Sequence, residues 1–262
     1  MKDAGHYLTT MRATAPLVHN ITNYVAMNVM ANVLLAAGAS PAMVHAREEA
    51  AEFASLAHSL SVNIGTLDPE WLLAMEEAAQ VMAAAEKPWV LDPVAGFATA
   101  LRRDATARLV ALGPTVVRGN ASEILGIAGA QAAGQGADAG DSVASAEAAA
   151  RTVAQRTGSV VAVTGEVDFV TDGQRAFHVA NGHALMPKVT VLGCSLTGLV
   201  AAFAVGQPAL EATTAALAYF GLAGERAAQQ AHGPGSLQVH LLDALHALHP
   251  EDLTAGARIS AA

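Results

Sequence analysis

The stretch Lys188-Val-Thr-Val-Leu-Gly-Cys-Ser-Leu-Thr-Gly198 leads from a partly extended segment, through a glycine, into a run of small residues. We expect a helix from Ser195 to Ala204, preceded by the turn Gly193-Cys194. The first N–H groups of a helix lack helical partners and lie at the positive end of the helix dipole, so this turn could hold a phosphoryl group. The alternative is an ordinary helix start with a core cysteine, because free cysteines are commonly buried.

Short apolar strands alternate with helical segments on the N-terminal side of this stretch. The expected strands are Pro16–His19, Ser40–His45, Ser61–Gly65, Pro88–Asp92, Thr115–Arg118 and Ser159–Val163. Two further segments around Asp172-Gly173, Asp168–Val170 and Arg175–Val179, are typical of a β-hairpin. Repeated strand–helix units predict an α/β fold with three layers, in which helices cover both faces of a mainly parallel central sheet.

The alternation of strands and helices predicts one domain spanning residues 1–262. The stretch Gly129–Asp141 is the most loop-like part of the chain, but the alternation resumes after it, so we do not interpret it as a linker. We expect three closing helices and a small, polar tail after Pro250 that frays. These helices are Ser195–Ala204, Pro208–His232 and Pro234–Leu248.

Charge and composition exclude several classes of partner. The net charge is −9 and no Lys/Arg cluster occurs, which argues against nucleic acid and anionic membranes as partners. No apolar run suits a membrane span, and the N-terminus lacks the pattern of a signal peptide. One cysteine cannot form an internal disulfide, so we expect a cytoplasmic location.

Two carboxylates follow expected strands on the edge of the sheet where ligands of such folds bind. Asp92 ends one strand, and Glu123 lies in the first turn of a helix that follows another. Mg²⁺ prefers one or two carboxylates together with waters and substrate phosphates, so this pair could hold Mg²⁺. Asn120 and Glu123 fit a helix capping box equally well, and the two roles can coexist.

Other polar residues end strands on the same edge. Arg118 could clamp a phosphate with two N–H groups, and Thr164 could contact a nucleotide phosphate. An ion pair and a simple turn are the respective alternatives. Asn23, Met43 and Gly65 could line a small, partly apolar pocket, although Met43 could equally pack in the core. The chain has no Gly-x-x-x-x-Gly-Lys-Ser/Thr loop, which excludes Walker-type kinases as a model.

A series of short segments also occurs in a specific order over nearly the whole chain. They are Pro16–Asn23, Gly38–Met43, Asn63–Leu67, Leu91–Val94, Arg118–Glu123, Val163–Asp168, Asn181–His183, Gly193-Cys194 and Gly233–Ser236. This ordered set resembles the hydroxyethylthiazole kinases of the ribokinase-like superfamily. The resemblance implies a ribokinase-like fold. It also implies ATP- and Mg²⁺-dependent phosphorylation of the hydroxyl of 4-methyl-5-(2-hydroxyethyl)thiazole in thiamine salvage.

The same resemblance implies a role for each candidate residue and a homotrimer with active sites between subunits. The thiazole alcohol would contact Asn23, Met43, Gly65 and Val191; ATP phosphates would contact Arg118 and Thr164; Mg²⁺ would be held by Asp92 and Glu123; and catalysis would involve Gly193 and Cys194. Most ribokinase-like sugar kinases have an aspartate base at the position of Cys194. Phosphoryl transfer depends mainly on positioning and charge stabilisation, so the substitution is tolerable. A thiol at a helix N-terminus can have a lowered pKa, but the sequence does not assign Cys194 a full base role.

Three residues depart from the pattern of these kinases. Val191 replaces a glycine whose backbone approaches the ligand, Leu192 replaces a small residue, and Phe97 replaces a glycine near the expected metal side. Added side chains could narrow the pocket or force the backbone away from the phosphate. Two alternatives therefore stay open: a kinase of another heterocyclic alcohol such as hydroxymethylpyrimidine, and a thiazole- or nucleotide-binding protein with weak turnover.

Overall fold

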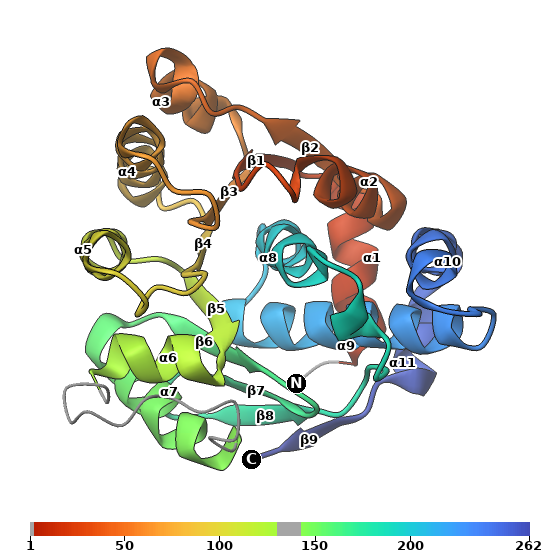
Figure 1. The fold of residues 1–262 in the computed structure, drawn as a ribbon. Coiled ribbons are helices and arrows are strands. Elements are labelled where there is room, and N and C mark those ends of the chain that lie inside the picture. The colour runs from red at the N-terminus through yellow and green to blue at the C-terminus, as the bar shows by residue number, and fades with distance from the viewer. Residues whose placement is uncertain (1–2, 130–142) are drawn as a thin grey trace.

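One mixed sheet with helices on both faces forms the framework of the protein (Figure 1). The computed structural model describes residues 3–129 and 143–262, so most of the loop expected over Gly129–Asp141 lies outside the described residues. The strands are β1 Leu17–Ile21, β2 Ser40–Met43, β3 Ser59–Asn63, β4 Trp89–Asp92, β5 Val116–Asn120, β6 Val160–Thr164, β7 Asp168–Thr171, β8 Ala176–Val179 and β9 Ile259–Ala261.

Helices precede, connect and follow these strands. They are α1 Ala4–Thr14, α2 Met27–Ala37, α3 Arg47–Leu56, α4 Pro69–Ala84, α5 Ala100–Ala111, α6 Ala121–Ala128, α7 Val143–Thr157, the 3₁₀ turn η2 Met186–Lys188, α8 Leu192–Phe203, α9 Ala209–Ala228, α10 Pro234–Ala247 and α11 Pro250–Gly256. None of the helices in the described ranges has the length and apolar character needed to cross a membrane.

The sheet has the strand order β2-β1-β3-β4-β5-β6-β7-β8-β9. The strands from β2 to β6 pair in parallel, and those from β6 to β9 pair antiparallel. The expected mainly parallel sheet and the β7–β8 hairpin are therefore confirmed. Because the carboxyl ends of the parallel strands share one edge, residues distant in sequence meet there.

Alternate strand residues pack into layers on opposite faces of the sheet. Val90 and Val116 join the core built with α1, α2, α8, α9 and α10. Their chain neighbours Leu91 and Val117 pack on the other face, against α3 to α5 and against α6 and α7 respectively. The three-layer prediction is confirmed, since residues adjacent in a strand point to opposite faces.

Both ends of the chain differ from expectation. Helix α1 was not predicted; its N-cap Asp3 accepts a hydrogen bond from the His6 N–H. The prediction of a fraying tail was wrong, because the residues from Pro250 onward form α11 and then β9, which pairs with β8. Thr254 of α11 donates to Asp3 at 2.9 Å, so the two termini stabilise each other.

Candidate active site

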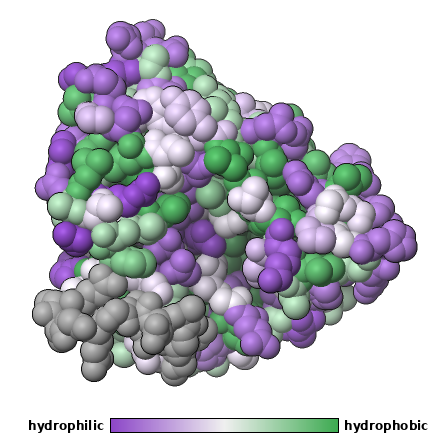
Figure 2. Space-filling view, viewed as in Figure 1, coloured by the Kyte–Doolittle hydropathy of each residue, from purple (hydrophilic) through white to green (hydrophobic). Residues whose placement is uncertain are grey.

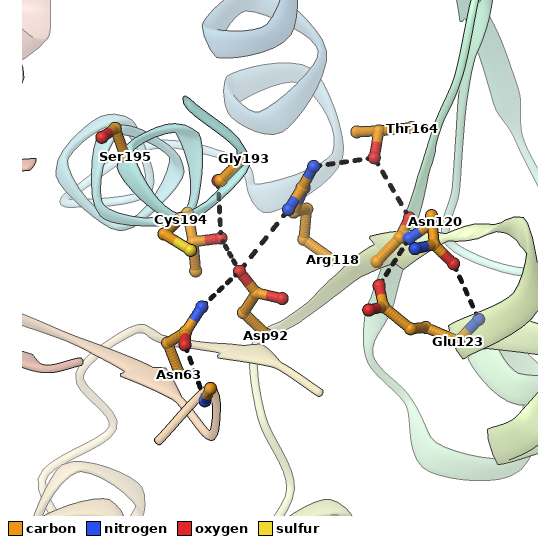
Figure 3. A network of polar contacts seen from close by, with 12 residues as sticks. Asn63, Asp92, Arg118, Asn120, Glu123, Thr164, Gly193, Cys194 and Ser195 are labelled. Carbon is orange, nitrogen blue, oxygen red and sulfur yellow. Dashed lines mark hydrogen bonds and ion pairs between the residues drawn. The ribbon is translucent and has the colours of Figure 1, made fainter. Parts of the chain in front are cut away.

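Side chains from four neighbouring strands meet in one polar network (Figure 3). Asn63 Nδ2 donates to Asp92 Oδ2 at 2.7 Å, and Arg118 Nη1 lies 3.5 Å from the same oxygen. Arg118 Nη2 donates to Thr164 Oγ1 at 2.8 Å. These residues lie at or near the carboxyl ends of β3, β4, β5 and β6. The sheet therefore brings them together at one edge, as the sequence predicted.

The network continues toward α8 through Asn23. Asn23 Nδ2 donates to Asn63 Oδ1 at 2.8 Å and lies 3.3 Å from Cys194 Sγ. Gly65 fits beside this pair because an added Cβ would lie 2.8 Å from the Asn23 side chain. Met43 makes no polar contact with the network; it is half-buried at the end of β2 and packs against the core that contains α8.

Asp92 and Glu123 are both buried but differ in their hydrogen bonds. Burial raises the pKa of Asp92, and the Arg118 guanidinium opposes that rise. Burial also raises the pKa of Glu123, and the nearby Asp92 carboxylate adds to it. Each Glu123 oxygen accepts one backbone N–H: Oε1 from Ala95 at 3.0 Å and Oε2 from Asn120 at 2.8 Å. The capping box is confirmed, since Asn120 accepts the Glu123 N–H in return.

The start of α8 differs from the prediction. The helix begins at Leu192 rather than Ser195, and the Ser195 N–H donates to the Val191 carbonyl at 2.9 Å. Ser195 therefore offers no free N–H. The N–H groups of Leu192, Gly193 and Cys194 have no acceptor among the described residues, as expected for a first helical turn.

Val191 adopts the left-handed backbone conformation, with φ 67° and ψ 0°. Glycine adopts this conformation freely, whereas a β-branched residue rarely does. Val191 thus holds a backbone conformation that glycine would adopt without strain. The expectation that Val191 narrows the pocket or moves the backbone stays a prediction. Phe97 lies against α6, since a Cβ added at Gly126 would lie 2.9 Å from the Phe97 Cβ.

The guanidinium of Arg118 lies against Gly193 in the first turn of α8. A Cβ added at Gly193 would lie 3.0 Å from Arg118 Nη1, so any larger residue would push the guanidinium away from the helix start. The Arg118 side chain is 11% exposed, and its Nε is buried without a hydrogen-bond partner in the described part of the chain. A guanidinium and free helical N–H groups are thus held in one small region, which suits a phosphate or another anion.

The Cys194 thiol is unsuited to act as a base at neutral pH. Burial raises its pKa, and the Asp92 carboxylate raises it further. The Asn23 side chain and the Arg118 guanidinium oppose this rise in the pKa. The Cys194 thiol lies 3.3 Å from Asn23 Nδ2, and the Cys194 backbone N–H belongs to the first turn of α8.

A cavity of about 1090 Å³ opens beside Arg118. It lies between the ends of β5 and β6, the segment 180–193 and α9, and Figure 2 shows hydrophilic residues within the hollow near the centre of this face. Four of the predicted site residues line it: Arg118, Thr164, Val191 and Gly193. The others lie beside it in the polar network, at β2 or in the α6 cap: Asn23, Met43, Gly65, Asp92, Glu123 and Cys194.

Comparisons with known proteins show the family of the chain. The sequence profile of the Hydroxyethylthiazole kinase family matches residues 8–251. The chain belongs to this family. A hydroxyethylthiazole kinase of Cereibacter sphaeroides (strain ATCC 17025) is 66% identical over 262 residues, with 100% of both chains covered. One from Rhizobium leguminosarum bv. trifolii is 62% identical over 260 residues, covering 98% of this chain and 97% of the relative.

Solved structures extend the comparison to the fold. The hydroxyethylthiazole kinase protein from Pyrococcus horikoshii OT3 has a TM-score of 0.93 and 40% identity, with 100% of both chains covered. A pyridoxal kinase from Staphylococcus aureus in complex with ADP has a TM-score of 0.60 at 17% identity, covering 78% of this chain and 86% of that one. The fold of this hydroxyethylthiazole kinase family member is thus ribokinase-like.

Sequence reasoning missed three residues of this family member's site. Asn63 and Thr197 both donate to Asp92, and Asp168 lines the cavity. Burial raises the pKa of Asp168 to about 7. Asn63 carried a signal, as a polar residue at the carboxyl end of an apolar strand. Thr197 could have been found from its place one helical turn after Gly193. No group of three or more His, Cys, Asp or Glu side chains suited to a metal occurs within residues 3–129 and 143–262.

Proposed function

We propose that this protein phosphorylates the hydroxyl of 4-methyl-5-(2-hydroxyethyl)thiazole with ATP, the reaction of a thiamine-salvage kinase. The observation that carries the kinase chemistry is the approach of Arg118 to Gly193 at the start of α8. There a guanidinium and the free N–H groups of Gly193 and Cys194 can stabilise charge on a phosphoryl group during transfer. Family membership over the whole chain supports the acceptor.

The cavity is the proposed nucleotide site. Its volume of about 1090 Å³ is ample for a nucleotide, and Arg118 and Thr164 lie where its phosphates would enter the network. In this arrangement Arg118 links the phosphates to Asp92, and Thr164 holds the guanidinium in position. The ion pair that the sequence offered as the alternative for Arg118 is also present, with Asp92, and it can coexist with a phosphate contact.

The proposed acceptor site lies on the other side of Cys194, with Asn23, Gly65 and Met43. Asn23 and Gly65 are joined through Asn63, and Met43 belongs to the edge strand β2. We infer that a second subunit completes this site, because Tyr24 and Val25, directly after Asn23, are 65% and 59% exposed. The family resemblance implies that the assembly is a homotrimer. Analytical ultracentrifugation tests the trimer, and a monomer at micromolar concentration would contradict it.

Mg²⁺ is the proposed metal ion, held by Asp92 and Glu123 together with substrate phosphates and water. These residues fit a hard cation: no described residue donates to Asp92 Oδ1, and each Glu123 oxygen accepts only one hydrogen bond. Proteins commonly bind Mg²⁺ through one or two carboxylates, and water and substrate phosphates supply the other ligands. When bound, it would neutralise phosphate charge. The chain's own residues hold the carboxylates buried and close together.

Product analysis tests the proposal. Purified protein is incubated with ATP, Mg²⁺ and the thiazole alcohol, and the phosphorylated thiazole is measured by mass spectrometry. Hydroxymethylpyrimidine in a parallel reaction tests the alternative acceptor. Nucleotide binding without any phosphorylated product would instead support a binding protein with lost turnover.

We also infer a single kinase domain over residues 1–262, because one sheet runs from β2 near the N-terminus to β9 at the C-terminus. One cooperative unfolding transition is expected by calorimetry, and two separated transitions would contradict it. A cytoplasmic location stays a prediction from the single cysteine.

A further inference from the structure

The two oxygens of the Asp92 carboxylate are used differently. Oδ2 lies 2.7 Å from Asn63 Nδ2, 2.9 Å from Thr197 Oγ1 and 3.5 Å from Arg118 Nη1. Oδ1 receives no hydrogen bond from any residue in the described ranges. Three donors on one oxygen fix the rotation of the carboxylate, and the other oxygen is left available to a ligand.

The amide of Asn63 supplies both the acceptor and the donor that its buried position requires. It pairs in register with Asp92 across β3 and β4 and is 1% exposed. Its Oδ1 accepts from Asn23 Nδ2 at 2.8 Å and from the Gly65 N–H at 2.9 Å, while its Nδ2 donates to Asp92. An aspartate would place a carboxylate against a carboxylate, and an apolar residue would leave buried polar groups unpaired. Asn63 therefore joins the proposed acceptor side to Asp92.

Thr197 joins the start of α8 to the same oxygen. Its hydroxyl is fully buried, 2.9 Å from Asp92 Oδ2 and 3.3 Å from the Gly193 carbonyl. A hydroxyl has one proton, and the shorter contact to a charged acceptor is the stronger one. Because Thr197 lies one turn after Gly193, it sets the distance between Asp92 and the free N–H groups of the first turn.

We propose that Asn63 and Thr197 are positioning residues that hold Asp92 with Oδ1 presented to the reacting groups. They act through Asp92 and touch no substrate themselves. This inference rests on the proposed function, in which Asp92 meets the Mg²⁺–nucleotide complex.

Thr197→Val tests the proposal, since valine has the shape of threonine but lacks the hydroxyl. The matched control is Thr214→Val in α9, a fully buried threonine that donates to the Leu210 carbonyl at 2.8 Å. Loss of one hydrogen bond to a charged group predicts a kcat about 10- to 100-fold lower for Thr197→Val, with the KM for the acceptor within about threefold. Thr214→Val stays within about twofold of the wild type, and Thr197→Ser restores most of the loss.

A double-mutant cycle with Asp92→Asn separates positioning from general structural damage. If Thr197 acts through Asp92, Thr197→Val has less than about a twofold further effect on kcat in the Asp92→Asn background. The same four proteins are also compared by thermal unfolding, which requires no turnover. The quantity measured is the rise in Tm caused by Mg²⁺ with a non-hydrolysable ATP analogue. That rise is smaller in Thr197→Val than in Thr214→Val and equal in Asp92→Asn and the double variant.

Two results would overturn the proposal: an unchanged kcat in Thr197→Val, or a loss of equal size with and without the Asp92 carboxylate. If Thr197→Val fails to fold, Asn63→Ala gives the second test, because it removes the donor to Asp92 Oδ2 without placing a second carboxyl group beside it. A wild-type kcat in that variant also overturns the proposal. If the wild type does not phosphorylate the thiazole alcohol, the proposed function fails, and the Tm cycle still decides the role of Thr197.

Discussion

We predict that the left-handed backbone conformation of Val191, at the start of α8, measurably lowers the free energy of unfolding of the protein. Its left-handed backbone, φ 67° and ψ 0°, costs an L-residue roughly 1–2 kcal/mol. Val191→Ala removes two methyl groups from a side chain that is 9% exposed, and so loses about 1.5 kcal/mol of burial. Val191→Gly loses at least as much burial, but glycine removes the strain at an entropic cost of roughly 0.5–1 kcal/mol. Val191→Gly also loses about 0.8 kcal/mol for the buried methyl group that alanine keeps. Relief of the strain offsets both losses, so we expect the two variants to have free energies of unfolding within about 1 kcal/mol of each other.

The control must separate strain from the general preference of helix caps for glycine over alanine. Ala46 is the N-cap of α3, has an ordinary extended backbone with φ −64°, and has no side-chain cap hydrogen bond. Urea unfolding of both Val191 variants, the wild type and Ala46→Gly gives the free energies of unfolding. The advantage of glycine over alanine is expected to be larger at position 191 than at position 46. Equal advantages at the two positions would refute the argument that Val191 is strained.

Further outcomes are expected from three single groups of the site. Burial raises the pKa of Asp168 to about 7 from its usual 3.8, so the wild type loses stability as pH rises from about 4 to 7. Asp168→Asn, which keeps an oxygen for the Gly165 N–H, should unfold at a higher temperature than the wild type at pH 8 and at a similar one at pH 3; equal behaviour at both pH values would contradict this. The Cys194 thiol, whose pKa burial raises, should react slowly with iodoacetamide at pH 7 and faster above pH 9. Cys194→Ala should lower kcat less than about tenfold, and a loss of 100-fold or more would indicate a base. Arg118→Lys should weaken ATP binding by about 10- to 100-fold in calorimetry, because an ammonium cannot reproduce the guanidinium contacts to both Asp92 and Thr164; unchanged affinity would place the phosphates elsewhere.

The sheet could be predicted from sequence because each parallel strand is an apolar run followed by a helix. The strand ending in Asp92 and the capping box of Asn120 and Glu123 are local patterns, so both were found. The two ends of the chain could not be found in the same way. Strand β9 exists because β8 offers an edge with which it pairs, and α1 packs against α9 and α11. Such contacts are decided by tertiary packing rather than by local propensity.

The start of α8 shows why the site itself was harder to predict than the fold. A helix beginning at Leu192 requires a left-handed residue at position 191, and valine gives no local signal for that conformation. The surrounding structure supplies the missing preference: Ser195 Oγ and Ser195 N–H both hold the Val191 carbonyl, and Thr197 ties the first turn to Asp92. If these bonds hold the turn, the three free N–H groups at the start of α8 keep their arrangement whether position 191 is glycine or valine. The departure at Val191 then alters the cavity wall and the stability of the protein, and leaves the groups that would bind the phosphoryl group in place.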